Sequence, residues 1–497
     1  MPLSAALARY AETQPDAPAV QIAGRTMSYG ELYVRGLGLN QFLSALPRQQ
    51  RAQTKVAEVP LIALHLGNAP VIPECLVAAL SGEVCVMLLD PLLPQDRIDE
   101  ILGLLPPDAV LTSQDAAAFP GVAPVFQLNC PSDLDALIAQ APDVETKPAD
   151  PESPFMVAFT SGTTSRPKAF ARDRAGWQRS LARGKVHFGT HPGLHTLSPG
   201  PLVHGLSLYA FAETLEAGAC FHTMEKFNAA EAAKLIQSHN IPRLVCVPTM
   251  LEALERHGVE LPQLSQITTA GAKLDDTLLA KAQQIAPNAQ ITEYYGASEL
   301  GFVTTITHQQ RSLARDQGVG QPFPGITLDI RNPDTDGNGE VWLQSDLKIQ
   351  DYLWRDDALG FQNQGDWSSV GDIGRLDTHG NLHLISRAGG MVVSGGNNIY
   401  PDEVAAYLKS HPAIQNAVVL GHPDSYLGHR LVAILSFEDQ PISAADLIAF
   451  CQQGLQKYKT PKAFLYVTDW PMTNSGKVST GQLRDWIEEK DTRLASL

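Results

Sequence analysis

Short, continuous runs of apolar residues alternate with segments of helical periodicity along most of the chain before residue 320. Runs bounded by turn-forming residues predict buried strands, because a strand covered on both faces carries apolar side chains at successive positions. Residues 228–239 and 275–285 have the pattern of helices between such strands. Strands that alternate with helices predict an α/β fold with parallel sheets. The predicted strands are 59–67, 84–90, 108–113, 155–160, 241–249 and 266–271.

The pattern changes from about residue 320, where turn-forming pairs follow one another at short intervals. These pairs are Asn332-Pro333, Asp336-Gly337 and His379-Gly380. They predict antiparallel hairpins or a small barrel. A glycine-rich joint at 388–390 follows, and a helix is predicted to begin at Tyr400-Pro401, because proline suits the first helical position. We therefore expect an N-terminal domain over residues 1–387 and a small α+β domain over residues 388–497.

Composition narrows the classes of function. The 497 residues include 37 Lys and Arg against 53 Asp and Glu, a net charge of −16. That balance disfavours binding to nucleic acid or to anionic lipid, but a few local cations still allow a small anionic ligand. The six cysteines are scattered without a CxxC pair, and the histidines form no metal-ligand spacing, so neither a disulfide framework nor a structural metal is expected. No apolar run of membrane-spanning length and no signal peptide is visible, which favours a cytoplasmic protein.

A loop of hydroxyl side chains ending in a lysine follows the predicted strand 155–160. Its residues run Thr160-Ser161-Gly162-Thr163-Thr164-Ser165-Arg166-Pro167-Lys168. Backbone N–H groups, hydroxyls and the lysine ammonium are donors that suit an oligophosphate. The loop is not a P-loop, since Pro167 stands where the second glycine belongs. Taken alone, the segment fits a phosphate-binding loop and a solvated polar turn equally well.

Four further turns carry polar side chains that fit a nucleotide site. Tyr294-Tyr295-Gly296 offers an aromatic ring and room beside it for a base. Glu299 offers a carboxylate oxygen for Mg²⁺. Asp372 lies in a tight turn where a carboxylate can accept hydrogen bonds from ribose, and Ser386-Arg387 follows at the domain joint. Lys477 ends a turn near the C-terminus. Each alone is weak, because aspartates in turns and surface lysines usually have only structural or solvating roles.

In this order and spacing the motifs resemble the adenylate-forming superfamily, which comprises acyl-CoA synthetases, peptide-synthetase adenylation domains and luciferases. The resemblance covers nearly the whole chain and includes residues 15–32 and 74–98. It implies an α/β fold with a large N-terminal domain, made of two α/β subdomains and a β-barrel, and a small mobile C-terminal domain. It also implies an acid–thiol ligase: a carboxylate attacks the α-phosphate of ATP, pyrophosphate leaves, and a thiol then takes the acyl group, as in fatty-acid activation.

The resemblance also assigns roles to individual residues. It places Thr160, Ser161, Gly162, Thr163, Thr164 and Lys168 on the β- and γ-phosphates; Gly271, Ala272, Tyr295 and Gly296 at the adenine; Ser298 on the α-phosphate; Glu299 on Mg²⁺; and Asp372 and Arg387 at the ribose. Lys477, His204 and Glu299 are the expected catalytic residues. Lys477 should reach the carboxylate and α-phosphate from the small domain, and a rotation at 387–389 should then withdraw it. His204 should lie beside the acid pocket, although a packing or gating role fits it as well.

Several positions depart from the family pattern. Ser165 and Ala169 replace glycines of the phosphate loop, and Gly389 replaces a charged hinge residue. Val393 and His429 replace a lysine and a glutamate of the small domain, which leaves the identity of the thiol acceptor open.

The segment 200–211 lacks the aspartate that would pair an ammonium group. A neutral aliphatic or aromatic acid is therefore favoured over an α-amino acid. The expected partners are that acid, ATP with Mg²⁺, and CoA. Two alternatives stay open: loading of a carrier-protein phosphopantetheine thiol, and a nucleotide-binding protein without catalysis.

Overall fold

The structure is a computed structural model that describes residues 4–51, 55–122, 124–143, 149–160, 168–313, 318–354, 361–387, 390, 392–394, 397–438, 440–473 and 477–497. The chain divides into two compact units. The first comprises residues 1–326 and 345–358, and the second comprises residues 327–344 and 359–497. No helix in the described ranges is long and apolar enough to cross a membrane.

One sheet of the first unit has a parallel centre and an antiparallel edge. In order across the sheet its described strands are β18 (Tyr352–Trp354), β8 (Lys168–Asp173), β7 (Pro154–Thr160), β4 (Cys85–Leu88), β3 (Leu61–His65), β5 (Ala109–Thr112) and β6 (Val125–Gln127). Strands β7, β4, β3, β5 and β6 pair in parallel, whereas β8 pairs antiparallel with both β7 and β18. Every residue of β3, β4 and β5 is buried, as predicted from their unbroken apolar runs.

The second sheet of the first unit carries the nucleotide motifs of the middle of the chain. Its described strands are, in order, β15 (Gln321–Pro322), β14 (Gly301–Thr307), β13 (Gln290–Ala297), β12 (Gln266–Thr269), β11 (Arg243–Cys246), β9 (Thr196–Leu197), β10 (Phe221–Thr223), β1 (Pro18–Ile22) and β2 (Arg25–Ser28). The strands from β13 to β1 pair in parallel. Both predicted central strands, β11 and β12, are confirmed.

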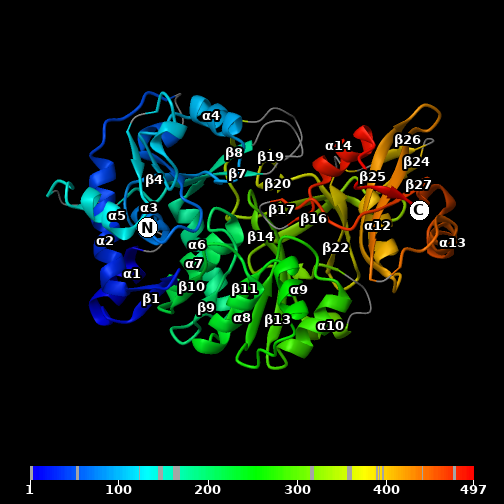
Figure 1. Cartoon of the computed structure of the whole chain (residues 1–497), viewed down its shortest axis with the longest axis horizontal. Coiled ribbons are helices and arrows are strands. Elements are labelled where there is room, and N and C mark those ends of the chain that lie inside the picture. Colours follow the sequence, from blue (N-terminus) through cyan, green and yellow to red (C-terminus); the bar gives the residue numbers. More distant parts are fainter. Residues whose placement is uncertain are drawn as a thin grey trace. The chain divides into compact units, whose positions relative to one another are not determined.

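Helices cover these two sheets. They are α1 (Ser4–Thr13), α2 (Tyr29–Ser44), α3 (Ile72–Ser81), α4 (Gln95–Leu104), α5 (Pro131–Ile138), α6 (Arg174–His187), α7 (Gly205–Ala217), α8 (Ala229–Ser238), α9 (Pro248–His257), α10 (Asp276–Ile285) and α11 (His308–Leu313). Figure 1 shows α8, α9 and α10 beside β11 and β13, and their apolar faces share one core with these strands. The side chains of Asn228 and Asp275 cap α8 and α10, so both predicted helices begin where the sequence indicates.

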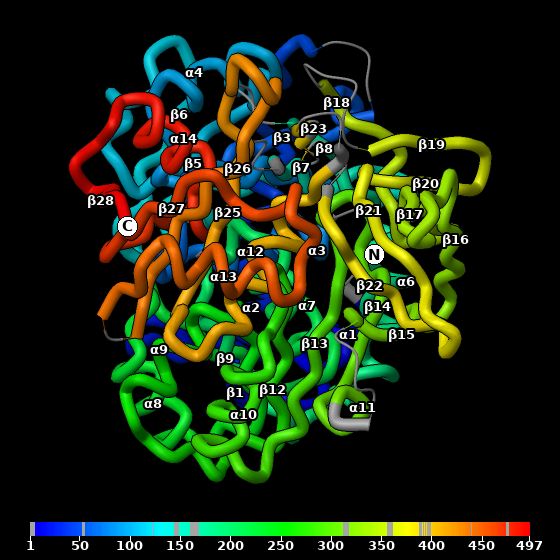
Figure 2. Tube along the Cα trace, turned by 90° about the vertical axis from the view of Figure 1, so that its right-hand side faces the viewer, coloured from blue at the N-terminus to red at the C-terminus, as the bar shows by residue number. Residues whose placement is uncertain are grey.

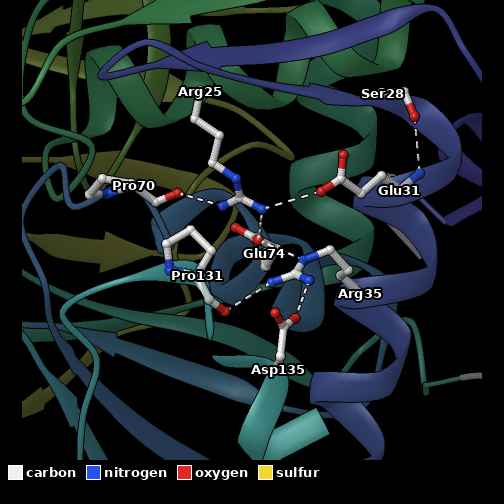
Figure 3. A network of polar contacts seen from close by, with 8 residues as sticks. All are labelled: Arg25, Ser28, Glu31, Arg35, Pro70, Glu74, Pro131 and Asp135. Carbon is white, nitrogen blue, oxygen red and sulfur yellow. Dashed lines mark hydrogen bonds and ion pairs between the residues drawn. The ribbon is translucent and has the colours of Figure 1, made fainter. Parts of the chain in front are cut away.

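A buried carboxylate ties four elements of the first unit together (Figure 3). Glu74 of α3 is fully buried. Its Oε1 accepts hydrogen bonds from Arg25 Nη2 of β2 at 2.6 Å and from Arg35 Nε of α2 at 2.9 Å. Arg35 also pairs with Asp135 of α5. A buried charge is tolerated when it is paired and hydrogen-bonded, and here one carboxylate fixes two helices and a strand.

The second unit contains two sheets. The first is antiparallel, in the order β19 (Gln362–Gln364), β20 (Trp367–Ser369), β17 (Gly339–Gln344), β21 (Asp372–Leu376) and β22 (Leu382–Arg387), with β16 (Thr327–Arg331) also paired to β17. Figure 2 shows these strands side by side. The predicted hairpins are therefore confirmed, with Gly337 (φ +80°) and Gly380 (φ +80°) at their turns. The predicted barrel is not confirmed.

The C-terminal sheet of the second unit is mixed. It has the order β24 (Asn397–Ile399), β23 (Val392–Ser394), β26 (Gly428–Phe437), β27 (Ala463–Tyr466) and β28 (Ala495–Ser496), with β25 (Ile414–Asp424) paired to β26. Helices α12 (Pro401–Lys409), α13 (Ala444–Gly454) and α14 (Thr480–Glu489) accompany it. Pro401 begins α12 as predicted, with Asp402 and Glu403 in the first turn. The expected domain boundary falls at residues 388 and 389, outside the described ranges, and it stays a prediction.

Candidate nucleotide-binding and catalytic site

The predicted phosphate loop connects two adjacent strands. Thr160 ends β7 and Lys168 begins β8, and the two residues are antiparallel partners. The base of the loop is therefore a strand pair that holds Lys168 in place. Residues 161–167, which include the predicted phosphate ligands Ser161, Gly162, Thr163 and Thr164, lie outside the described ranges, as does the side chain of Thr160. Their roles stay predictions.

Three side chains of the first unit gather where the phosphate loop meets the strand pair β8–β18. The Lys168 ammonium lies 5.8 Å from the centre of the Tyr352 ring, close enough for a cation–π contact. The Tyr352 hydroxyl donates a 2.6 Å hydrogen bond to Glu299 Oε1. Tyr352 reaches both residues because β18 pairs with β8, with Tyr352 opposite Phe170. The structure thus brings together Lys168 and Glu299, two predicted site residues 131 positions apart in the sequence (299 − 168).

Glu299 has the environment expected of a residue that binds one cation. Its exposure is only 7%, and its Oε1 accepts the hydrogen bond from Tyr352. No group of three or more His, Cys, Asp or Glu side chains in the described ranges could hold a metal ion by itself. A single carboxylate is nevertheless sufficient for Mg²⁺, which takes its remaining ligands from substrate phosphates and water. Glu299 therefore fits the ion when a nucleotide supplies the other oxygens.

A tight hairpin positions the residues around Glu299. Strand β13 ends at Ala297 and β14 begins at Gly301, which has φ +76°. A side chain at Gly296 would come within 2.4 Å of the Gly301 carbonyl oxygen, so only glycine permits this approach of the two strands. Tyr295, Gly296 and Ser298 are thus fixed at one end of the hairpin together with Glu299.

The predicted adenine residues lie at the carboxyl ends of two neighbouring parallel strands. Thr269 of β12 pairs with Glu293 of β13, and Gly271 and Tyr295 each follow two residues later. Gly271 has φ +89°, and both it and Ala272 are exposed. Ligands of open α/β sheets bind at such carboxyl ends. Gly271, Ala272, Tyr295 and Gly296 therefore share one edge of the sheet, as a base-binding site requires.

A buried ion pair supports this edge. Arg311 Nη1 lies 2.7 Å from Glu293 Oε2, and Glu293 is only 4% exposed. Burial raises the pKa of Glu293 to about 7, while Arg311 and Lys273 act in the opposite direction. Neither Glu293 nor Arg311 was among the predicted site residues, since a charged pair between a strand and a following helix leaves no local signal in the sequence.

His204 lies at the start of α7, as the residue that caps it. Its Nε2 is 3.6 Å from Asp90 Oδ2, which forms an ion pair when the imidazole is protonated. Asp90 begins the segment that resembles the family's DPxxPxxR stretch. The contact observed for His204 is thus with a carboxylate of the chain, and its predicted contact with the substrate acid stays a prediction.

The second unit contains the remaining predicted residues. Asp372 begins β21 directly after Gly371 (φ +78°), is 6% exposed, and is the antiparallel partner of Arg387 at the end of β22. The backbone thus places both predicted ribose ligands side by side. Lys477 is exposed, and its backbone is held by Thr473: Thr473 N–H donates to the Lys477 carbonyl at 2.6 Å, and Lys477 N–H donates to Thr473 Oγ1 at 3.1 Å.

Two residues that make contacts in the site were not predicted. Tyr352 connects Lys168 to Glu299, and the buried Arg172 side chain donates hydrogen bonds to the backbone carbonyls of Ser298 and Leu347. The only available signal was the period of strand β8, which places Lys168, Phe170 and Arg172 on one face. Two cations on the same face of a buried strand are unusual enough to suggest an anionic neighbour.

Comparisons with known proteins show the family of the chain. The family described as AMP-binding enzyme matches residues 7–353, and its C-terminal domain family matches residues 403–477. An uncharacterised acyl–CoA ligase of Bacillus subtilis, YhfT, is 29% identical over 490 residues, covering 96% of this chain and 97% of the relative. A 2-succinylbenzoate–CoA ligase of Staphylococcus aureus (strain MW2) is 31% identical over 328 residues, 66% of each chain.

Solved structures show the same fold. The o-succinylbenzoate CoA synthetase MenE from Bacillus subtilis, in complex with its acyl-adenylate intermediate, superposes with a TM-score of 0.84 at 23% identity, covering 100% of this chain and 99% of the other. ATP-bound MatB from Rhodopseudomonas palustris has a TM-score of 0.83 at 22% identity, with 99% of each chain covered. Fold and family match together define an AMP-binding enzyme. The chain belongs to the AMP-binding enzyme family.

Proposed function

We propose that this protein activates a neutral aliphatic or aromatic carboxylic acid with ATP and transfers the acyl group to the thiol of CoA. A carboxylate oxygen of the acid bonds to the α-phosphorus, the bond from that phosphorus to the bridging oxygen breaks, and pyrophosphate leaves. The thiol sulfur then bonds to the acyl carbon, the thiol loses its proton, and AMP leaves with the carboxylate oxygen. The observation that carries the proposal is the cluster of Lys168, Tyr352 and Glu299 at the base of the phosphate loop.

The residues of the chain act mainly by holding charge in place. Lys168 and the loop before it would bind the β- and γ-phosphates, and the Ser298 hydroxyl would donate a hydrogen bond to an α-phosphate oxygen. Mg²⁺ on Glu299 would neutralise charge that develops on the leaving pyrophosphate. Such preorganised electrostatics, without a covalent protein intermediate, is the usual basis of transfer at phosphorus. Asp372 and Arg387 would orient the ribose, and Lys477 would stabilise the pentavalent α-phosphate.

The acid and the acceptor are inferred from the relatives and from helix α7. Relatives named CoA ligases favour CoA as the acceptor. Helix α7, which begins beside His204, is apolar along most of its length, so the pocket it would line suits an uncharged acyl group. The carrier-protein alternative rests on Val393 and His429 in the small domain. We further propose that this domain begins at residue 388 and turns at 387–389 between the two half-reactions.

ATP–pyrophosphate exchange over a panel of fatty, aryl and short-chain acids tests the proposal. The expected result is exchange with at least one neutral acid, followed by formation of its CoA thioester when CoA is added. A parallel reaction with a pantetheinylated carrier protein separates the acceptors: acylation of the carrier alone would refute the CoA assignment. Absence of exchange with every acid, while ATP still binds, would favour a nucleotide-binding protein without catalysis.

A further inference from the structure

Arg172 is an unusual residue for the interior of this sheet. It lies in β8, four residues after Lys168, and is 8% exposed. Its Nη1 donates to the carbonyl oxygen of Leu347, and its Nη2 donates to that of Ser298. Leu347 lies in the segment that leads to Tyr352, and Ser298 lies in the turn that carries Glu299. One guanidinium therefore joins strand β8 to both sides of the Glu299 site.

The charge of Arg172 is not explained by packing. Among the described residues its partners are backbone carbonyls, and it forms no ion pair. Burial lowers its pKa to about 10, and the main opposing effect is the attraction of Glu299. A buried cation is costly unless an opposite charge lies near it. Glu299 supplies that charge, which links Arg172 electrostatically to the predicted Mg²⁺ ligand.

The turn that carries Glu299 accepts a second backbone hydrogen bond, which comes from the segment that contains Leu347. Ile349 N–H donates a 2.8 Å hydrogen bond to the Glu299 carbonyl oxygen. Together with the Arg172–Ser298 bond, this fixes the carbonyl groups of the two peptides that flank the Glu299 Cα. The Tyr352 hydroxyl fixes the carboxylate itself. Among the residues that the structure describes, these three contacts to Ser298 and Glu299 come from β8 and from residues 349–352.

We propose that Arg172 is the positioning residue for Ser298 and Glu299, and that it sets the affinity of the site for Mg²⁺ bound with ATP. The proposal rests on the proposed function only in taking Glu299 as the Mg²⁺ ligand. Arg172 holds the Ser298–Glu299 backbone in the conformation that presents the hydroxyl and carboxylate to the nucleotide. It also compensates the Glu299 charge before the ion binds.

The direction in which Mg²⁺ affinity changes when Arg172 is removed distinguishes a positioning role from a purely electrostatic one. If Arg172 acted only as a nearby positive charge, its removal would strengthen Mg²⁺ binding, because like charges repel. If it positions the turn, its removal weakens Mg²⁺ binding. We expect Arg172→Met to raise the half-saturating Mg²⁺ concentration in ATP–pyrophosphate exchange by about 10- to 100-fold, the usual effect of losing a residue that orients a metal ligand. Arg172→Lys, which retains the charge and one donor, should recover a substantial part of that loss.

Arg174 provides a matched control two residues away. It is fully buried, and it too donates to two backbone carbonyls, of Ala79 at 2.5 Å and of Val84 at 2.9 Å. Burial lowers its pKa to about 10 as well. Its carbonyl partners belong to α3 and to the start of β4, away from Glu299. Arg174→Met should therefore lower the melting temperature at least as much as Arg172→Met while leaving the Mg²⁺ dependence unchanged.

A second readout needs no catalysis. The rise in melting temperature on adding ATP is measured over a range of Mg²⁺ concentrations for the wild type and for all variants. Loss of the Mg²⁺-dependent rise in Arg172→Met but not in Arg174→Met supports the proposal even if no acid is found to be activated. Equal Mg²⁺ dependence in the two Met variants, or tighter Mg²⁺ binding in Arg172→Met, overturns it. If a Met variant does not fold, Arg172→Lys against Arg174→Lys makes the same comparison.

Discussion

At the scale of single residues, one buried histidine of the second sheet lies close to two others, of which His195 is half-buried and His239 is exposed. His222 of β10 is 5% exposed, and its ring lies 6.3 Å from that of His195 and 5.2 Å from that of His239. Burial, with smaller effects from these two neighbours, lowers the pKa of His222 to about 3 from its ordinary value of 6.5. Below pH 6.5 the unfolded chain therefore binds a proton that the folded chain excludes.

This pKa shift predicts acid lability with a definite sign. The contribution of His222 to the free energy of unfolding is complete above pH 6.5 and is lost progressively as the pH falls towards 3. Between pH 7 and pH 5 the loss is about 2 kcal/mol. His222→Phe should flatten the fall in stability over this range, as measured by urea unfolding at several pH values. His257→Gln, at an exposed position, should leave the dependence of the free energy of unfolding on pH as it is in the wild type. If His222→Phe lost as much stability between pH 7 and pH 5 as the wild type, the acid lability would not come from His222.

At the scale of elements, polar contacts between residues far apart in the sequence hold neighbouring helices and strands together. Glu74 joins α3 to α2 and β2, and its loss would leave the Arg25 and Arg35 guanidinium groups without their buried acceptor. Removing one partner of a buried ion pair costs about 3–5 kcal/mol, since the remaining charge stays in the interior. We expect Glu74→Ala to lower the free energy of unfolding by this amount.

Glu31 is the control for Glu74. It also pairs with Arg25, at 3.5 Å, but its side chain is 44% exposed. Exposed pairs contribute about 0–1 kcal/mol, so Glu31→Ala should be nearly neutral in denaturant unfolding. A cost for Glu74→Ala no larger than that for Glu31→Ala would show that the contacts of Figure 3 do not hold these elements together.

The elements themselves were predictable from local patterns, whereas their connections were not. Runs of apolar residues located β3, β4, β5 and β7, and the capping side chains of Asn228 and Asp275 located the starts of two helices. These signals lie within a few residues of each other in the sequence. The Arg172–Ser298 and Tyr352–Glu299 contacts join residues 126 and 53 positions apart, and no local pattern reports such a pairing.

At the scale of the whole molecule, the first unit gathers two cations on one strand of an acidic chain. The net charge is −16, yet Lys168 and the buried Arg172 lie on one face of β8. A local positive field attracts a small polyanion such as ATP, while the overall charge disfavours extended polyanions. The family resemblance predicts the role of Lys168, and the geometry adds Tyr352 and Arg172 as its neighbours in the first unit.

We expect Lys477 to be needed for adenylation but not for thioester formation. Its side chain is exposed, and its backbone is held by Thr473, so Lys477→Ala should fold normally. In adenylation the ammonium would stabilise charge at the α-phosphate; the loss of one such donor costs about 10²–10³-fold in rate. Thioester formation from pre-made acyl adenylate should remain close to wild type if, as proposed, the lysine acts in only one arrangement of the small domain.

Both half-reactions can be measured on the same Lys477→Ala preparation: pyrophosphate exchange for the first, and CoA thioester formation from synthetic acyl adenylate for the second. Lys462→Ala, an exposed lysine elsewhere in the C-terminal sheet region, should leave both rates unchanged. Equal loss of both half-reactions in Lys477→Ala would mean that the lysine serves both steps from a single arrangement. Selective loss of exchange would instead require that the C-terminal domain moves between them, because a residue fixed beside the α-phosphate would also contact the acyl adenylate during attack by the thiol.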